Sequence, residues 1–190
     1  VALVLYRPEL ERHVKLEVKR EKLKNTTVET QLLEVEEVKI GYVIISLFAE
    51  NTAEEWKKAL DVLFAKEVQG LIIDVRDNPG GYLHSVAQMM SMFEQNEKIF
   101  AYMQNHDGAT ESLKTKTSEA FEPYAKQLSA MPITILQNEG SASASEVFAG
   151  ALQDWKRAVV IGVTSFGKGT VQQTWELQNG GEVKLSTNKW

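Results

Sequence analysis

The feature of this chain that most restricts its fold is a regular alternation of strand-length apolar segments and amphipathic segments, which begins at Gly41. Stretches with apolar residues three and four positions apart predict helices between short apolar strands. This alternation is typical of an α/β layered domain, and we expect a mixed sheet with flanking helices. The predicted strands are Tyr42 to Leu47, Leu71 to Val75, Ile99 to Tyr102, Ile133 to Leu136 and Ala158 to Val163.

Three helices are predicted, and we interpret their apolar stripes as core rather than as a cofactor site. Thr52 and Glu55 have the spacing of a capping box, which predicts that the first helix opens there. The stripes are Ala53, Trp56, Leu60, Leu63 and Phe64 in the first helix; Val86, Met89, Met90 and Phe93 in the second; and Ala144, Val147, Phe148, Ala151, Leu152 and Trp155 in the third.

The two ends of the chain differ from this pattern. Residues 1–20 alternate in polarity around Pro8, which predicts a β-hairpin, and a strand is predicted from Val28 to Leu33 after a polar stretch. We therefore expect an N-terminal fragment over 1–25 and a main domain over 26–190, with a cap or linker strand over 26–40 and a core over 41–190. We expect the chain to be part of a longer protein.

Two further segments follow less regular patterns. The hydrophobic residues between Asn105 and Ala130 are scattered, which predicts a long connection with little regular structure. Strand-like sequence returns over 171–177 and 182–187, and Asn179 with two glycines between these segments predicts a hairpin turn.

Composition excludes several classes of function. The 190 residues include 21 Lys and Arg against 26 Asp and Glu, a net charge of −5, so the basic surface of a nucleic-acid binder is not expected. The chain has no cysteine, which excludes disulfide scaffolds, thiol nucleophiles and Cys-ligated zinc. The histidines stand at 13, 84 and 106, without metal-ligand spacing, and we expect neither metal nor cofactor. Covalent catalysis would therefore use oxygen or nitrogen.

The first candidate motif is Asp-Val-Arg-Asp-Asn-Pro-Gly-Gly over 74–81, where a predicted strand ends and a helix begins. Adjacent glycines at a helix N-terminus leave backbone N–H groups uncovered, as in anion and oxyanion sites. The alternative is a tight turn in which the glycines serve only the backbone conformation.

The second motif is Gly-Ser-Ala-Ser-Ala-Ser-Glu over 140–146, which also joins a strand to a helix. A serine at a helix start can act as a nucleophile because the helix dipole and nearby N–H groups favour its ionised form. Ser143 and Glu146 also have the spacing of an ordinary capping box. The motif lacks the glycine of a G-x-S-x-G elbow, which argues against an α/β-hydrolase.

The third motif is Ser-Phe-Gly-Lys-Gly-Thr-Val-Gln over 165–172. A lysine between two glycines can enter a crowded site and, when neutral, act as a base. The ordinary alternative is a solvated turn lysine. Gly162, Gly167 and Lys168 match the first part of a P-loop. However, Gly169 stands where Ser or Thr should bind Mg²⁺, and strand-like sequence follows, so nucleotide binding is not expected.

In this order, the three motifs resemble the carboxyl-terminal processing (tail-specific) proteases, serine endopeptidases with a serine/lysine dyad. The resemblance covers about Gly41 to Trp190. It implies a ClpP/crotonase-like α/β protease core. It also implies that the N-terminal hairpin is the last part of a largely absent PDZ domain, which in this family binds substrate C-termini.

The resemblance also implies roles for particular residues. Ser143 matches the nucleophile, Lys168, 25 positions later, matches the base, and Gln172 matches the residue that orients the lysine. The oxyanion hole would use the backbone N–H of Ala144 and one from the glycine pair, with Gly81 favoured over Gly80.

The resemblance implies further properties of the whole protein. It implies cleavage of polypeptides near their C-terminal ends, a polypeptide substrate with an apolar C-terminus, assembly into a homo-oligomer such as a dimer, an extracytoplasmic location, and no metal or cofactor. Two alternatives remain. One is a catalytically silent peptide-binding scaffold with the same fold, and the other is a crotonase-like acyl-CoA enzyme that shares the oxyanion N–H pair.

Overall fold

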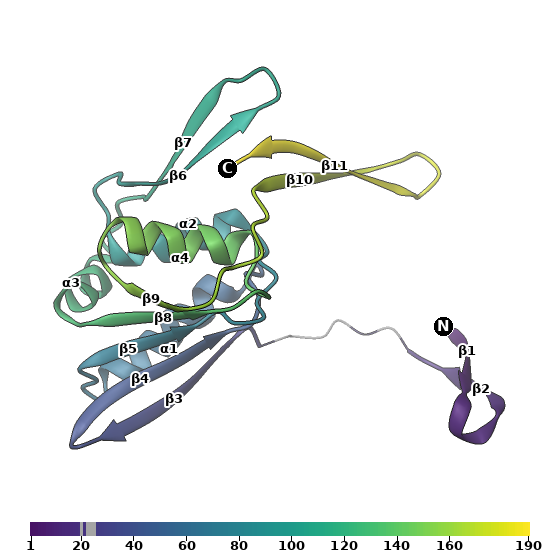
Figure 1. Ribbon diagram of the computed structural model, residues 1–190, viewed down its shortest axis with the longest axis horizontal. Coiled ribbons are helices and arrows are strands. Elements are labelled where there is room, and N and C mark those ends of the chain that lie inside the picture. The colour runs from purple at the N-terminus through teal and green to yellow at the C-terminus, as the bar shows by residue number, and fades with distance from the viewer. Residues whose placement is uncertain (20, 22–25) are drawn as a thin grey trace.

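The N-terminal hairpin has the structure that its alternating pattern predicts. The computed structural model describes residues 1–19, 21 and 26–190. Strands β1 (Ala2–Arg7) and β2 (Arg12–Glu17) pair antiparallel, joined by the short 3-10 turn Pro8–Leu10 (Figure 1). The hairpin contributes no residue to the main hydrophobic core. The domain boundary expected after residue 25 lies outside the described residues.

A mixed five-stranded sheet forms the centre of the main domain. Its spatial order is β3-β4-β5-β8-β9, with β3 antiparallel to β4 and the other neighbours parallel. Each strand overlaps a predicted one, and together with the helices they confirm the expected α/β class. The bounds are β3 (Val28–Val35), β4 (Val38–Ile45), β5 (Gly70–Asp74), β8 (Ile133–Gln137) and β9 (Val159–Gly162).

Helices connect the parallel strands. α1 (Thr52–Phe64) joins β4 to β5, α2 (Leu83–Phe93) follows β5, and α4 (Ala144–Asp154) joins β8 to β9. Right-handed crossovers that all advance in one direction place their helices on one face of the sheet. The buried side chains of the sheet support this placement. Val43, Ile73 and Ile135 occupy matched positions on neighbouring strands, and all three are fully buried.

Aromatic side chains from the helices and the loop after β4 form the centre of the core. Phe48 lies 5.7 Å from Phe148, and Trp56 stacks on Phe93 at 5.8 Å between ring centroids. Met89 and Met90 are fully buried in the same cluster. The interpretation of the helical stripes as core is therefore confirmed, because burial of these large side chains drives helix and sheet together.

The expectation of an irregular connection over 105–130 is wrong. Strands β6 (Ile99–Asn105) and β7 (Thr110–Lys114) form a hairpin, and α3 (Glu122–Ala130) follows. The apolar signal is weak because β7 is an edge strand and α3 buries only two side chains, Tyr124 and Leu128. A short helix with two buried residues has too little periodicity to be recognised in the sequence.

The last predicted hairpin is confirmed. Strands β10 (Thr170–Glu176) and β11 (Glu182–Lys189) pair antiparallel, and β11 continues into a second sheet with the order β10-β11-β6-β7. Figure 1 shows these hairpins on the far side of α2 and α4 from the five-stranded sheet. Among the described residues, no helix is long and apolar enough to span a bilayer.

The expected capping box at the first helix is wrong. Asn51 is the N-cap of α1, and Thr52 is the first helical residue. The Thr52 hydroxyl accepts the Ala49 N–H at 2.8 Å. The Glu55 carboxylate instead accepts the backbone N–H of Thr27 at 2.7 Å, so it fastens the beginning of β3 to the helix.

Candidate active site

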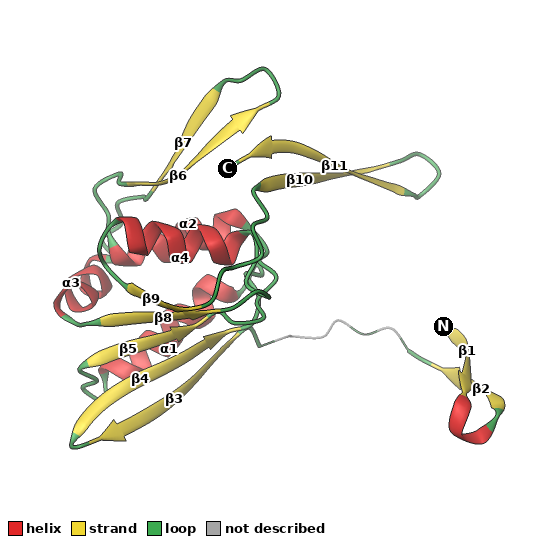
Figure 2. Ribbon diagram, viewed as in Figure 1, coloured by secondary structure: helices red, strands yellow, loops and turns green. Residues whose placement is uncertain are grey.

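The three loops that follow β4, β5 and β8 meet at one edge of the sheet. Parallel strands end on the same side, and the loops over 46–51, 75–82 and 138–143 therefore gather there (Figure 2). In α/β sheets this carboxyl edge is where ligands bind. Two of the three candidate motifs lie in these loops.

Ser143 stands at the turn between β8 and α4 with a strained backbone. Its φ of 55° and ψ of −115° lie in a region that side-chain-bearing residues rarely adopt, at a cost of about 1–3 kcal/mol. A strained serine at a sharp strand-to-helix turn is the geometry of a nucleophile elbow, because the hydroxyl is exposed to a site. The turn has this geometry even though the sequence lacks the glycines of the usual elbow motif.

Asn78 holds the turn at Ser143 against the glycine loop. It is fully buried, and its side-chain amide donates to the Ile45 carbonyl at 2.7 Å. Its backbone carbonyl accepts the N–H of Ala142 at 3.0 Å and the hydroxyl of Ser145 at 2.9 Å. The strain at Ser143 is therefore maintained by a buried polar network that joins the two loops.

The two glycines of the first motif have different hydrogen bonds. The Gly80 N–H donates to the Asn78 side-chain oxygen at 2.9 Å. Phe48 pairs with the residues on either side of Gly81, accepting the Tyr82 N–H and donating to the Gly80 carbonyl. The Gly81 N–H therefore points away from Phe48, and it has no partner in the described part of the chain.

Close contacts with neighbouring backbone leave no room for a β-carbon at either glycine. At Gly81 a β-carbon would lie 2.1 Å from the Phe48 carbonyl oxygen. Gly80 has φ of 103°, and a β-carbon there would lie 2.7 Å from the Ala142 carbonyl oxygen and 3.0 Å from the Ala144 nitrogen. The backbone N–H of Ala144, at the start of α4, likewise has no partner among the described residues. The turn therefore offers two unpaired donors close to Ser143, from Gly81 and Ala144, whereas Gly80 offers none.

Glu146 connects the turn at Ser143 to the third motif. One carboxylate oxygen accepts the Ser143 N–H at 2.6 Å and the Lys168 N–H at 3.0 Å. The other accepts the Ser165 hydroxyl at 2.8 Å and the Gly167 N–H at 2.7 Å. The sequence indicated Glu146 only as a capping partner of Ser143. Its contacts with the third motif depend on a chain reversal that sequence spacing does not show.

An open pocket of about 450 Å³ lies where the three motifs meet. Four of the six predicted site residues line it, namely Ser143, Lys168, Gln172 and Gly81. The other two, Gly80 and Ala144, are buried directly behind the Ser143 turn. The remaining lining residues are Pro79, Tyr82, Leu83, Thr170, Val171, Thr174 and Lys184.

His84 is not a partner of Ser143. Its Nε2 lies 3.0 Å from a carboxylate oxygen of Glu50, both side chains are exposed, and His84 does not line the pocket. The only histidine next to a candidate motif is therefore outside the site.

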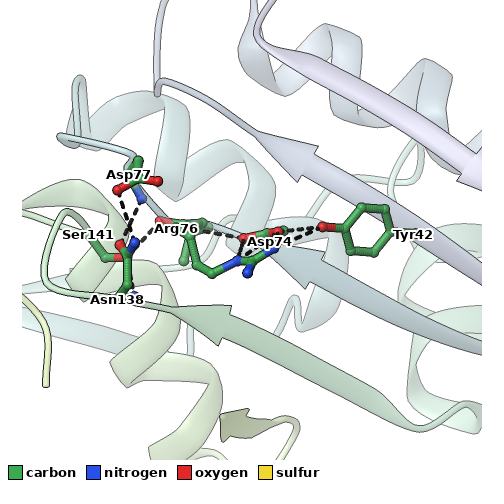
Figure 3. Close-up of polar contacts among 7 residues, drawn as sticks. Tyr42, Asp74, Arg76, Asp77, Asn138 and Ser141 are labelled. Carbon is green, nitrogen blue, oxygen red and sulfur yellow. Dashed lines mark hydrogen bonds and ion pairs between the residues drawn. The ribbon is translucent and has the colours of Figure 1, made fainter. Parts of the chain in front are cut away.

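A cluster next to the first motif was not predicted. Tyr42 and Arg76 both donate to the buried Asp74 carboxylate, with Arg76 Nη2 at 2.6 Å (Figure 3). Burial would raise the pKa of Asp74, but the hydrogen bonds from Arg76 and Tyr42 outweigh it and lower the pKa. The hydrogen bond to Asp74 and burial raise the pKa of Tyr42. Asp74 and Arg76 are visible in the motif, but Tyr42 joins them only through the pairing of β4 with β5.

A reciprocal pair joins two of the loops. The Asp77 N–H donates to the Asn138 side-chain oxygen at 2.8 Å, and the Asn138 amide donates back to the Asp77 carboxylate at 2.9 Å (Figure 3). Asp77 has φ of 58°, so these bonds maintain an unusual backbone conformation at the start of the glycine loop.

A serine with a strained backbone and a lysine therefore line one pocket of a mixed α/β fold. The chain belongs to peptidase family S41, whose family model matches residues 39–190. The family is that of the carboxyl-terminal processing proteases, which confirms the resemblance of the three motifs.

The relatives agree with this assignment. The chain is 36% identical over its whole length to the carboxy-terminal processing protease CtpB of Bacillus subtilis, and covers 38% of that protein. It is 34% identical to CtpA of the same organism, with 94% of the chain and 36% of the relative covered. The chain thus spans under two fifths of these relatives. The solved photosystem II D1 C-terminal processing protease superposes with a TM-score of 0.72 at 26% identity, covering 99% of the chain and 50% of that structure.

Proposed function

We propose that this chain is the catalytic core of a serine endopeptidase that cleaves polypeptides at or near their C-terminal region. The observation that carries the proposal is the strained turn at Ser143, whose side chain shares one pocket with Lys168 and Gln172. Family membership supports the same activity.

The proposed reaction is acyl transfer. The Ser143 Oγ attacks the carbonyl carbon of the scissile bond while its proton passes to neutral Lys168 Nζ, and the Gly81 and Ala144 N–H groups stabilise the oxyanion. Collapse of this intermediate breaks the C–N bond, and the lysine returns the proton to the leaving amine. Water then attacks the acyl-enzyme in the same way and releases the acid and Ser143.

Gln172 and Glu146 would position the base. Gln172 follows Lys168 by four residues on β10 and lines the same pocket, and Glu146 holds the lysine's backbone. The described residues show no hydrogen bond between Ser143 Oγ and Lys168 Nζ. Because catalytic hydrogen bonds often tighten only when substrate is present, we expect this one to close in the complex.

The finer fold assignments belong to the same proposal. A ClpP/crotonase-like core is supported by the helices that lie on one face of the sheet. The hairpin β1–β2 is proposed to be the end of a PDZ domain, because Val4, Leu5 and Tyr6 are exposed there and need a partner to cover them. A substrate with an apolar C-terminus, a homo-oligomer and an extracytoplasmic location remain predictions for the whole protein.

The first test measures cleavage and serine labelling together. An unfolded polypeptide with an apolar C-terminus is incubated with the full-length protein and with Ser143→Ala, Lys168→Ala and Ser129→Ala variants, and products are identified by intact mass. Ser129 is the control because it is an exposed serine of α3. A fluorophosphonate, from which an activated serine displaces fluoride to form a phosphonate ester, reports the reactivity of Ser143.

We expect cleavage and labelling in the unchanged protein and in Ser129→Ala, and loss of both in the two site variants. Cleavage by Ser143→Ala would overturn the proposal. A protein that binds the polypeptide, does not cleave it and does not react with the fluorophosphonate would be the silent scaffold. Hydrolysis of an acyl-CoA without serine labelling would indicate the crotonase-like enzyme.

A further inference from the structure

The charge of the pocket differs from the charge of the chain. The chain has a net charge of −5, yet the pocket is lined by no aspartate or glutamate among the described residues and carries Lys184 beside Lys168, which serves the proposed reaction as a neutral base. The proposed mechanism uses Lys168 and leaves Lys184 without a function. A free ammonium group in a substrate pocket is a feature that recognises anions.

The register of the last hairpin directs Lys184 to the pocket. Gln172 and Thr174 both line the pocket from β10, two residues apart, so they share one face of the hairpin. Lys184 of β11 is the cross-strand partner of Thr174, and cross-strand partners lie on the same face. No carboxylate of the described residues forms an ion pair with Lys184.

The helix ends strengthen the same polarity. α4 begins at Ala144 and α2 at Leu83, both beside the pocket, so their positive N-terminal ends face it. The first turn of α2 carries no acidic residue. The one acidic residue in the first turn of α4 is Glu146, whose two oxygens are occupied by N–H and hydroxyl donors.

We infer that Lys184 binds a carboxylate of the substrate peptide close to the scissile bond, and this inference rests on the proposed function. Thr174 lies two residues along β10 from Gln172, about 7 Å, and both line the pocket that contains Ser143, so the carboxylate would bind in the same pocket as the reacting carbonyl. The carboxylate has two sources, the terminal carboxylate of the substrate or the side chain of an internal Asp or Glu. The substrate class is therefore a polypeptide with a negative charge near the cleaved bond.

Binding to a catalytically inert protein tests this inference without depending on cleavage. A short fluorescein-labelled apolar peptide is prepared with a C-terminal acid or amide, and in each case with an internal Glu or Gln. Fluorescence anisotropy measures its Kd for full-length Ser143→Ala protein, alone and combined with Lys184→Ala, Lys184→Arg or Lys66→Glu. Lys66 is exposed beyond the end of α1, at the opposite edge of the sheet, and controls for net charge.

We expect a carboxylate to tighten binding about two- to fivefold over its neutral counterpart, as for exposed ion pairs. Lys184→Ala should reduce that ratio to about one, while Lys184→Arg and Lys66→Glu retain it. The peptide pair that shows the preference identifies the source of the carboxylate. A merely structural lysine would weaken all four peptides equally.

Three outcomes would overturn the inference: equal binding of charged and neutral peptides, a preference that survives in Lys184→Ala, or no binding of any peptide. None of these decides the proposed function, because fluorophosphonate labelling of Ser143 is measured separately on protein with the serine intact. Loss of labelling with a retained carboxylate preference would leave Lys184 as a binding residue of a silent scaffold.

Discussion

The carboxylate of Glu146 accepts the backbone N–H of Ser143 at 2.6 Å, and the same oxygen accepts the N–H of Lys168 at 3.0 Å. One side chain therefore sets the separation between the backbone of the proposed nucleophile and that of the proposed base. These residues are 25 positions apart and belong to different loops. Glu146 is a positioning residue in this arrangement, because its oxygens contact backbone and Ser165 rather than the pocket.

Removing that carboxylate should reduce the rate rather than substrate binding. Glu146→Ala is expected to lower kcat by about 100-fold, the cost of a misplacement of about 1 Å, with KM changed little. Glu146→Gln keeps an oxygen acceptor and should lose less. Steady-state kinetics with a fluorogenic peptide measures both constants. Glu139→Ala, at an exposed site in the loop before α4, is the control. An unchanged kcat in Glu146→Ala would exclude the positioning function.

Asn78 should be important for stability. Asn78→Ala leaves the Ile45 carbonyl and the Gly80 N–H without their buried partners, and each such loss costs about 1–3 kcal/mol. We expect the free energy of unfolding in urea to fall by about 2–4 kcal/mol. Asn96→Ala, at an exposed site, should change it little. Equal stability of the two variants would show that the network does not maintain the turn.

Gly80 and Gly108 offer a matched pair of alanine substitutions. Both have positive φ, but a β-carbon at Gly80 would lie 2.7 Å from the Ala142 carbonyl, whereas one at Gly108 has nothing within 4 Å. Gly108→Ala should cost only backbone strain, about 1 kcal/mol. Gly80→Ala should cost more and reduce Ser143 labelling, because the turn must shift. Thermal unfolding and labelling rates measure the difference between the two variants. Equal effects of the two substitutions would contradict this prediction.

Asp74 should make stability depend on pH at both ends of the range. Its pKa is lowered in the folded state, so its contribution is complete above its usual value of 3.8 and is lost as the pH falls through the lowered value. The pKa of Tyr42 is raised above 10.0, so its contribution is present below pH 10.0 and lost as the pH rises through the raised value.

The difference in unfolding free energy between the unchanged protein and Asp74→Asn should therefore be largest between these limits, at about 2 kcal/mol, and shrink outside them. Asp107→Asn, which alters an exposed contact between the Asp107 carboxylate and His106, is the control and should show a small difference. A difference for Asp74→Asn that does not vary with pH would contradict the assigned charge state.

Much of the fold could be predicted from local pattern. The strands and the three helices with wide apolar stripes were predicted because burial imposes a period of two or 3.6 on neighbouring residues. α3 and β7 were not, since α3 buries only Tyr124 and Leu128, and an edge strand needs little alternation. The capping box at Thr52 was wrong because Glu55 bonds to Thr27, 28 positions away.

The sequence by itself determined the family and the three motifs that lie at the pocket, because each motif is a continuous run with its own turn chemistry. Only the tertiary structure decided which donors are free: Gly80 is satisfied by Asn78, and Gly81 is left open because Phe48 pairs with its neighbours. Likewise only strand register brings Lys184 to the pocket, and only the approach of two loops gives Glu146 its second set of partners. Hydrogen-bond satisfaction and charge proximity depend on distances between residues remote in sequence, which packing of the whole core sets.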